Sequence, residues 1–359
     1  MKLRILIPER NILLTEWEKS LIDSKEGFER KWNVLPQISN IPAKIKKIFQ
    51  EYKLSKNQEN FAFIADSSLG YLLNFFYKKR SVVWCWDLCY LFLGSTSLKS
   101  KMAFKINVRG MSKAKRIIVA SENTKRDFLK YTGIPENKIK VIYAGVSHKN
   151  FKRYSPKSYE NARAFVREKC NVNDNEKLLL YVGGEQPRKN IPTLLKAVKM
   201  IKTPIKLLII GPRDYGERNH EELVNLVKHL DIENKIIFAG NFPHDSLPDY
   251  FNAADLFVFP SYYEGFGLPP LEAMSCGLPV ITTGCSSLPE VVGDAAIKIT
   301  DPFDDKILAE KIDLVLTDKN LRENMIKKGL EQSKKFSWKK YAKDVSETCM
   351  EIWNEKKRC

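Results

Sequence analysis

A glycine-containing loop lies at residues 261–277, where the sequence reads SYYEGFGLPPLEAMSCG. It directly follows LFVFP, a short apolar run that predicts a buried strand. Gly265 and Gly267 allow the backbone to approach a ligand closely, and Pro269 and Pro270 are typical of the start of a helix. A strand, a glycine loop and a helix N-terminus in this order favour the binding of an anion, because the first N–H groups of a helix lack partners within it.

Two carboxylates frame this loop, Glu264 before it and Glu272 in the predicted first helical turn. A carboxylate accepts hydrogen bonds from neighbouring hydroxyl groups, so a sugar and a ribose are natural partners. The alternative is that Glu272 only complements the helix dipole and that Glu264 is a solvated loop residue. The loop by itself leaves both interpretations open.

A second segment with the same organisation is YVGGEQPRKN at residues 181–190. Gly184 belongs to a Gly-Gly turn after a predicted strand, and Arg188 and Lys189 come just before a predicted helix. Arginine binds a phosphate as a bidentate fork, and lysine binds it as a point charge. An isolated basic pair is usually surface charge, but its position after the turn predicts a phosphate clamp.

Short apolar runs alternate with helical patterns along the chain. The strands and helices that they predict are the elements that hold these two loops in place. The runs lie at 3–7, 61–65, 81–86, 116–120 and 139–143, and then at 178–183, 205–211, 236–240, 256–260, 279–283 and 296–299. Apolar strands that alternate with amphipathic helices are typical of parallel sheets buried on both faces. We therefore expect an α/β fold with two doubly wound domains and a ligand in the cleft between them, at the carboxyl ends of the strands.

The positive charge is concentrated in the first part of the chain. The formal net charge is +17 over 359 residues, and residues 1–150 hold 28 Lys and Arg against 13 Asp and Glu, whereas residues 151–300 hold 18 of each. This asymmetry suggests a polyanionic partner for the first domain, or else it is only solubilising charge. Nucleic acid is the weakest candidate, because no recognised module and no basic-aromatic stacking motif is present.

Several features indicate a cytoplasmic protein with an anionic membrane surface as an additional partner. Residues 41–54 predict a basic amphipathic helix, which either lies on a membrane or packs on its own sheet. A further basic run without acidic residues spans 99–116. The seven cysteines form no C-x-x-C pair, which favours a reducing compartment. The N-terminus predicts no signal peptide, and the most apolar stretch, 82–93, is shorter than the roughly 18 residues that span a bilayer.

Together these residues resemble family 4 glycosyltransferases of the GT-B architecture, also called glycosyl transferases group 1. The most specific part is E-x7-E at Glu264 and Glu272, together with the EGFGLP loop. GEQPRKNIPTLLKAV is similar to the donor-phosphate segment of the family, and SSLPEVVGDAA is similar to its usual continuation. Within the latter, Ser287 and Glu290 also fit a capping box at a helix start.

The resemblance implies two Rossmann-like domains facing a cleft. It implies a basic acceptor-side domain at 1–150, a linker at 151–175, a nucleotide-sugar domain at 176–335 and a C-terminal helix at 336–359 that crosses back to the first domain. The implied reaction is retaining, metal-independent transfer of a mannose- or glucose-type hexose from a UDP- or GDP-sugar, with no cofactor. The implied acceptor is a glycan or a lipid-linked molecule in cell-surface polysaccharide or glycoconjugate synthesis.

The resemblance also assigns roles to single residues. Arg188 and Lys189 would neutralise the departing diphosphate, and Glu264 would hold hydroxyls of the transferred sugar. The residues expected around the donor are Gly184, Gly265, Phe266, Gly267, Leu268 and Glu272, of which Glu272 would bind the ribose.

One position departs from the family pattern. Where the family often has a His-Asp pair after the fourth strand, this sequence has Trp86 and Asp87. Asp87 is kept as a candidate catalytic residue, whereas Trp86 replaces the histidine. This departure indicates either an unusual acceptor or reduced turnover, and the complete donor half favours the first. Two alternatives stay open, a nucleotide-sugar epimerase on the same fold and a nonenzymatic subunit that keeps the donor fold.

Overall fold

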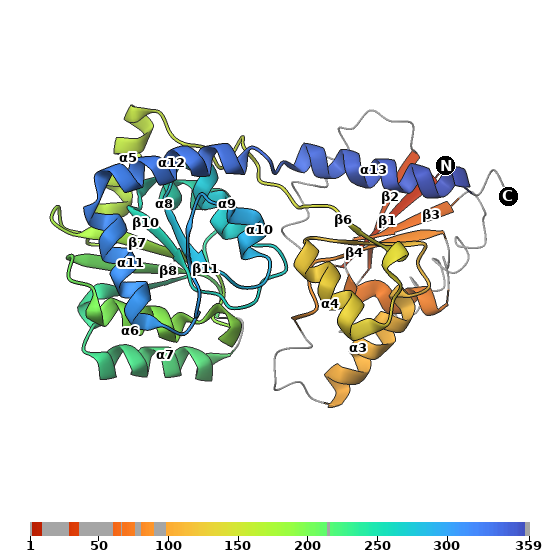
Figure 1. Cartoon of the computed structure of the whole chain (residues 1–359), viewed down its shortest axis with the longest axis horizontal. Coiled ribbons are helices and arrows are strands. Elements are labelled where there is room, and N and C mark those ends of the chain that lie inside the picture. The colour runs from red at the N-terminus through yellow and green to blue at the C-terminus, as the bar shows by residue number, and fades with distance from the viewer. Residues whose placement is uncertain are drawn as a thin grey trace. The chain divides into compact units, whose positions relative to one another are not determined.

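The computed structural model describes residues 2–8, 29–35, 60–65, 67–75, 80–89, 98–213 and 216–355. The chain divides into two compact units (Figure 1). The first contains Met1–Gly145 together with Trp338–Cys359, and the second is Val146–Ser337. Each unit contains one six-stranded sheet among its described residues.

The sheet of the first unit is parallel and has the order β2-β1-β3-β4-β5-β6. Its strands are β1 (Lys2–Pro8), β2 (Glu29–Leu35), β3 (Asn60–Ile64), β4 (Ser81–Cys85), β5 (Arg116–Val119) and β6 (Ile139–Val141). Its helices are η1 (Ser67–Asn74), α3 (Leu98–Met111), α4 (Glu122–Thr132), η3 (Glu136–Lys138) and α13 (Trp338–Glu355). Strand β2 was not predicted, because its sequence ERKWNVL is too polar for an apolar run.

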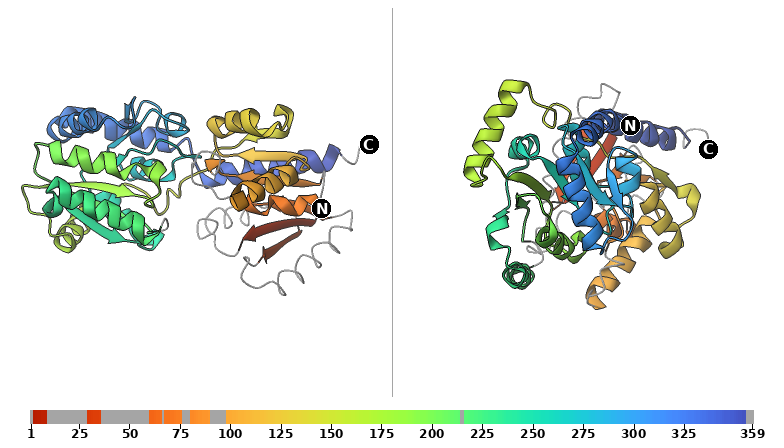
Figure 2. Two further views of the ribbon diagram at one scale, coloured as in Figure 1. Left: turned by 90° about the horizontal axis from the view of Figure 1, so that it is seen from below. Right: turned by 60° about the vertical axis from the view of Figure 1, so that its left-hand side comes forward.

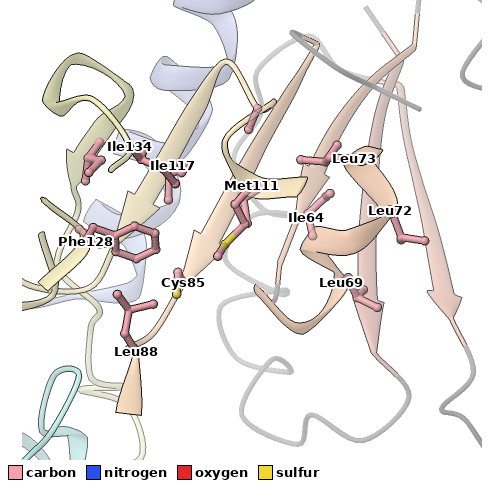
Figure 3. Packing of buried hydrophobic residues seen from close by; sticks show 14 of the residues in the cluster. Ile64, Leu69, Leu72, Leu73, Cys85, Leu88, Met111, Ile117, Phe128 and Ile134 are labelled. Atoms are coloured by element: carbon pink, nitrogen blue, oxygen red, sulfur yellow. The ribbon is translucent and has the colours of Figure 1, made fainter. Parts of the chain in front are cut away.

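Strand β4 shows how both faces of this sheet are buried. Cys85 points to the same face as Met111 of α3 and Phe128 of α4, in a cluster of buried side chains (Figure 3). Trp84 points to the opposite face, since successive side chains of a strand alternate. There its ring meets the ring of Tyr341 from α13 edge-to-face at 4.8 Å. The last helix of the chain is therefore part of the core of the first unit.

The sheet of the second unit is also parallel and has the order β12-β11-β10-β7-β8-β9. Its strands are β7 (Lys177–Val182), β8 (Ile205–Ile210), β9 (Ile236–Gly240), β10 (Leu256–Phe259), β11 (Val280–Thr283) and β12 (Ile297–Ile299). Its α-helices are α5 (Pro156–Lys169), α6 (Ile191–Met200), α7 (Glu217–Leu230), α8 (Leu247–Ala253), α9 (Leu268–Ser275), α10 (Leu288–Val292), α11 (Asp305–Thr317) and α12 (Lys319–Ser333). Short 3-10 helices lie at η4 (Pro187–Lys189), η5 (Glu233–Lys235) and η6 (His244–Ser246).

Helices cover both faces of the second sheet (Figure 2). Helix α6 packs beside α7 and α11, while α5 packs on α8 and α9 packs on α10 and α12. The two parallel sheets with their helices confirm the expected fold class. The strand order, counted along the chain, is the doubly wound order 3-2-1-4-5-6. The order in which the chain adds strands reverses between β7 and β10. The loops that follow these two strands therefore lie at the topological switch point, where doubly wound sheets bind ligands.

The segment expected to be a linker, 151–175, is instead largely the helix α5. Its buried residues Ala162 and Val166 lie four positions apart on one face, and this apolar stripe holds the helix against the unit. Arg163 of the same helix donates a hydrogen bond to the carbonyl oxygen of Ala253 at 3.1 Å. The segment therefore belongs to the second unit.

Two expectations concern the membrane. In the part of the chain that the structure describes, no helix combines the length and the apolar character needed to cross a bilayer. The predicted amphipathic helix at 41–54 lies outside the described residues.

Candidate functional site

The loop after β7 is shaped by a very close approach of two backbone segments. A Cβ atom on Gly211, which follows β8, would lie 1.8 Å from the carbonyl oxygen of Gly183. Only glycine fits at this position, and the Gly-Gly turn at the end of β7 is thereby fixed against the end of β8. The turn continues through η4, which carries Arg188 and Lys189, into helix α6.

Hydrogen bonds to backbone carbonyl oxygens join this loop to the loop after β10. The backbone N–H of Tyr262 and the hydroxyl of Ser261 both donate to the carbonyl oxygen of Arg188, at 3.0 and 2.9 Å. The amide of Asn190 donates to the carbonyl oxygen of Pro260 at 3.2 Å. The two segments singled out in the sequence are thus one structural unit at the switch point of the sheet.

A buried ion-pair cluster forms where the two loops meet. The Glu264 Oε1 atom lies 2.7 Å from Lys189 Nζ, and Oε2 lies 2.9 Å from Arg188 Nη1. The Ser261 hydroxyl also lies 2.7 Å from Oε1, so its single proton is shared between Oε1 and the Arg188 carbonyl oxygen. Glu264 and Lys189 are both more than nine-tenths buried. We call Arg188, Lys189, Glu264 and Ser261 the charged cluster.

The charged cluster keeps Glu264 ionised. Burial alone would raise the pKa of its carboxyl group, because the charged form loses its solvation. The positive charges of Lys189 and Arg188, and the hydrogen bonds from Lys189 and Ser261, outweigh this effect and hold the pKa below its ordinary value. The cluster therefore has two fixed cations and one fixed anion.

Two serines from the next loop hold the backbone of Glu264. The Ser286 hydroxyl donates to the Glu264 carbonyl oxygen at 2.6 Å, and the Ser287 hydroxyl donates to the carbonyl oxygens of Glu264 and Phe266 at 2.9 and 2.8 Å. The capping box predicted from Ser287 and Glu290 is wrong, because Ser287 makes no side-chain cap bond to α10. Its hydroxyl bonds to carbonyl oxygens of the glycine loop instead.

Helix α9 begins at Leu268, directly after the glycine loop. Gly267 has a φ of 116°, which L side chains rarely adopt, and an added Cβ would lie 2.9 Å from a methyl carbon of Leu288. The backbone of Phe266, Gly267 and Leu268 therefore reaches the helix N-terminus in the order predicted for an anion site. Gly265 and Gly184 lie in the two joined loops.

Glu272 lies deeper in α9 than predicted. It is the fifth residue of the helix, and the first turn of α9 contains no acidic residue. The expectation of a first-turn carboxylate is wrong, because the helix begins before the two prolines and not at them. Since a dipole effect falls off within the first turn, the dipole explanation loses its basis. The Glu272 Oε1 atom instead lies 3.0 Å from His244 Nε2.

Asp87 belongs to the first unit, in the segment that follows β4. Its Oδ1 atom accepts a hydrogen bond from the backbone N–H of Cys89 at 2.9 Å. The neighbouring ring of Trp86 packs edge-on against Trp84 at 5.2 Å. The other candidates, Arg188, Lys189, Glu264 and Glu272, belong to the second unit.

Sequence reasoning missed a buried pair beside the site. His220 Nδ1 of α7 lies 2.8 Å from Oε1 of Glu185, which directly follows the Gly-Gly turn. Both side chains are more than nine-tenths buried. The pair ties the turn to α7. A glutamate directly after a glycine turn was the available signal, but its partner lies 35 positions away and could not be identified from the sequence.

In the part of the chain that the structure describes, neither a metal-ligand cluster nor the cavity of about 470 Å³ marks the switch point. Among the described residues, no group of three His, Cys, Asp or Glu side chains is placed to hold a metal ion. A cavity of about 470 Å³ lies near the opposite ends of the strands and is lined by residues such as Arg153, Tyr159 and Pro279. It contains none of the predicted site residues.

Residues 162–332 match the family model described as glycosyl transferases group 1. This part of the chain is therefore similar to that family. The O-antigen chain mannosyltransferase B of Escherichia coli is 42% identical over 163 residues, which are 44% of this chain and 42% of that protein. The matches to this and other curated relatives cover between 26% and 58% of the length of those proteins.

Solved structures show that a known fold extends over nearly the whole chain. A sucrose-phosphate synthase from Thermosynechococcus elongatus has a TM-score of 0.81 and 20% identity, with 99% of this chain and 100% of that chain covered. HepE of Anabaena in complex with UDP-glucose has a TM-score of 0.79 and 20% identity, with 98% and 100% covered. These likenesses confirm the GT-B fold.

Proposed function

We propose that the protein is a retaining, metal-independent glycosyltransferase that moves a hexose from a UDP- or GDP-sugar to a glycan or lipid-linked acceptor. The charged cluster carries this proposal, because it places two fixed cations next to a helix N-terminus at the switch point of a doubly wound sheet. The family model that residues 162–332 match supports it.

The chemistry follows from where charge develops. As the bond between sugar and phosphate breaks, negative charge grows on the departing diphosphate. Arg188 and Lys189 stabilise that charge, and their contacts with Glu264 keep them from reorienting during the reaction. The positive end of the helix dipole at the N-terminus of α9 stabilises the same negative charge. The carboxylates of Glu264 and Glu272 accept hydrogen bonds from hydroxyl groups of the sugar and the ribose. Asp87 is proposed to be a further catalytic residue, as the family resemblance implies.

The relatives support the kind of sugar and product. HepE of Anabaena was solved with UDP-glucose, and the Escherichia coli relative is named a mannosyltransferase of an O-antigen chain. We therefore propose a glucose- or mannose-type hexose and a role in cell-surface polysaccharide or glycoconjugate synthesis.

Thermal unfolding with UDP, GDP, ADP and CMP tests the donor site, because a ligand that binds only the native state raises its stability. We expect a shift with UDP or GDP that EDTA does not change. Lys189→Ala should abolish the shift, whereas Lys196→Ala, an exposed lysine of α6, should keep it. The absence of a shift with all four nucleotides would contradict the proposal.

Product analysis tests the reaction. With the matching UDP- or GDP-sugar and an acceptor, we expect a glycoside with the anomeric configuration of the donor, as measured by NMR. A changed sugar nucleotide formed without an acceptor would instead identify an epimerase. Donor binding without any turnover would favour a nonenzymatic subunit.

We propose further that the first unit binds an anionic membrane surface from the cytoplasmic side. Helix α3 contains four Lys and Arg and no acidic residue. Its exposed face carries Lys105 and Arg109 beside Met102 and Ile106, whose side chains are 59% and 48% exposed. Phe75 is 67% exposed. The residue before it, Asn74, contacts α3, because its side-chain amide donates to the Ile106 carbonyl oxygen at 3.1 Å. Basic and apolar side chains on one face are typical of interfacial helices.

Flotation with vesicles tests this surface. We expect binding to phosphatidylcholine vesicles that contain phosphatidylglycerol, weakened by salt and by Ile106→Asp, and no binding to phosphatidylcholine alone. Phe165→Asp, at a 53% exposed position of the second unit, is the matched control and should not change binding. If the protein stays unbound at low salt, the membrane proposal fails.

A further inference from the structure

We propose that His244 is a positioning residue that orients the Glu272 carboxylate, so that its second oxygen accepts a hydrogen bond from the ribose of the donor nucleotide. This inference rests on the proposed function, because it assumes that a nucleoside diphosphate binds at the switch point. It adds a residue that neither the sequence motifs nor the family resemblance pointed to.

The pair is built by two separate elements. His244 is the first residue of η6, which follows β9, and Glu272 lies on α9. The atoms His244 Nε2 and Glu272 Oε1 are 3.0 Å apart. The imidazole ring also packs on the ring of Phe151 at 4.9 Å, and Phe151 is buried. The orientation of the imidazole is therefore set by packing as well as by the hydrogen bond.

The chemistry of the pair fixes the direction of the hydrogen bond. An ionised carboxylate only accepts hydrogen bonds, so His244 must donate from Nε2. The hydrogen bond engages one of the two oxygens of Glu272 and fixes the orientation of the carboxylate plane. Within the described part of the chain, the contact with His244 is the only side-chain hydrogen bond of Glu272.

The second oxygen of Glu272 is not one of the fully buried oxygens without a partner, so it is accessible and can accept a hydrogen bond from a ligand. The Glu272 side chain is only 8% exposed, and a carboxylate that is largely removed from water is stabilised by hydrogen bonds to its oxygens. Glu264 differs, because its oxygens already accept bonds from Lys189, Ser261 and Arg188. Of the two carboxylates in the E-x7-E pattern, Glu272 therefore has more acceptor capacity left for a hydroxyl group.

A comparison of two ligands tests the inference. The dissociation constant is measured for the nucleoside diphosphate that stabilises the wild type and for its 2′,3′-dideoxy analogue. We expect the wild type to prefer the ribose form by about tenfold, the size of one hydrogen bond to a charged group. His244→Ala should remove this preference and leave the affinity for the dideoxy analogue unchanged.

Two variants separate positioning from a merely structural role. His244→Gln should keep the preference, because the glutamine amide also donates from Nε2, whereas Glu272→Gln should lose it. His148→Ala is the matched control, since His148 contacts Ser275 of the same helix at 3.1 Å and should affect only thermal stability. Equal weakening of both ligands in His244→Ala, or an unchanged preference, would overturn the inference. If the wild type binds no nucleotide at all, the donor proposal fails and this inference fails with it.

Discussion

At the scale of single residues, the site depends on one buried carboxylate. Glu264 neutralises one of two adjacent cations and, through Lys189 and Arg188, joins the loop after β10 to the loop after β7. Without the charge of Glu264, Lys189 would lose the carboxylate that lies 2.7 Å from its Nζ atom. Removing one partner of a buried ion pair is strongly destabilising, because the other charge stays buried.

We predict that Glu264→Gln lowers the free energy of unfolding by about 3–5 kcal/mol at neutral pH. The folded pKa of Glu264 lies below its ordinary value of 4.5, so its contribution is present above that value and is lost as the pH falls through the folded pKa. The difference between wild type and variant should therefore shrink in acid. Urea unfolding at several pH values measures it, and a difference that is constant with pH would contradict the assigned charge.

At the scale of elements, the site depends on how closely the ends of β7 and β8 approach each other. We predict that Gly211→Ala destabilises the protein by about 1–3 kcal/mol and weakens nucleotide binding, because the added methyl group must displace the Gly183 carbonyl. Gly284→Ala is the control. It also follows a strand, but its Cβ would lie 3.6 Å from the nearest atom, an ordinary contact. Thermal unfolding with and without nucleotide compares the two, and equal effects would show that the close approach is unimportant.

At the scale of the whole molecule, the chain returns to the first unit at its end. Tyr341 of α13 is fully buried against Trp84, whereas Met350 of the same helix is 36% exposed. We predict that Tyr341→Ala destabilises the first unit by about 3–5 kcal/mol, and that Met350→Ala changes stability by about 0.5 kcal/mol or less. Hydrogen exchange should speed up in β3, β4 and β5 and stay unchanged in β7 and β10. Loss of protection in β7 and β10 instead would contradict the division into units.

The sequence by itself determined the fold class and the position of the two loops that meet at the switch point. Eleven of the twelve strands in the described chain, all except β2, could be predicted from apolar runs, because a strand in a parallel sheet is buried on both faces. Strand β2 and helix α5 were missed as elements, since ERKWNVL is polar and the apolar stripe of α5 is narrow. The E-x7-E pattern and the Arg-Lys pair indicated an anion site, because glycine loops and helix starts can be recognised from residues that are close together in the sequence.

Only the tertiary structure decided which side chains meet. Glu264 and Lys189 are 75 positions apart, and His244 and Glu272 are 28 apart. The order of strands in the sheet brings such residues together, and no local pattern encodes that order. Burial then decides what each group does. Lys189 at a surface would be solvated charge, but beside a buried carboxylate it is a fixed cation whose position the fold determines.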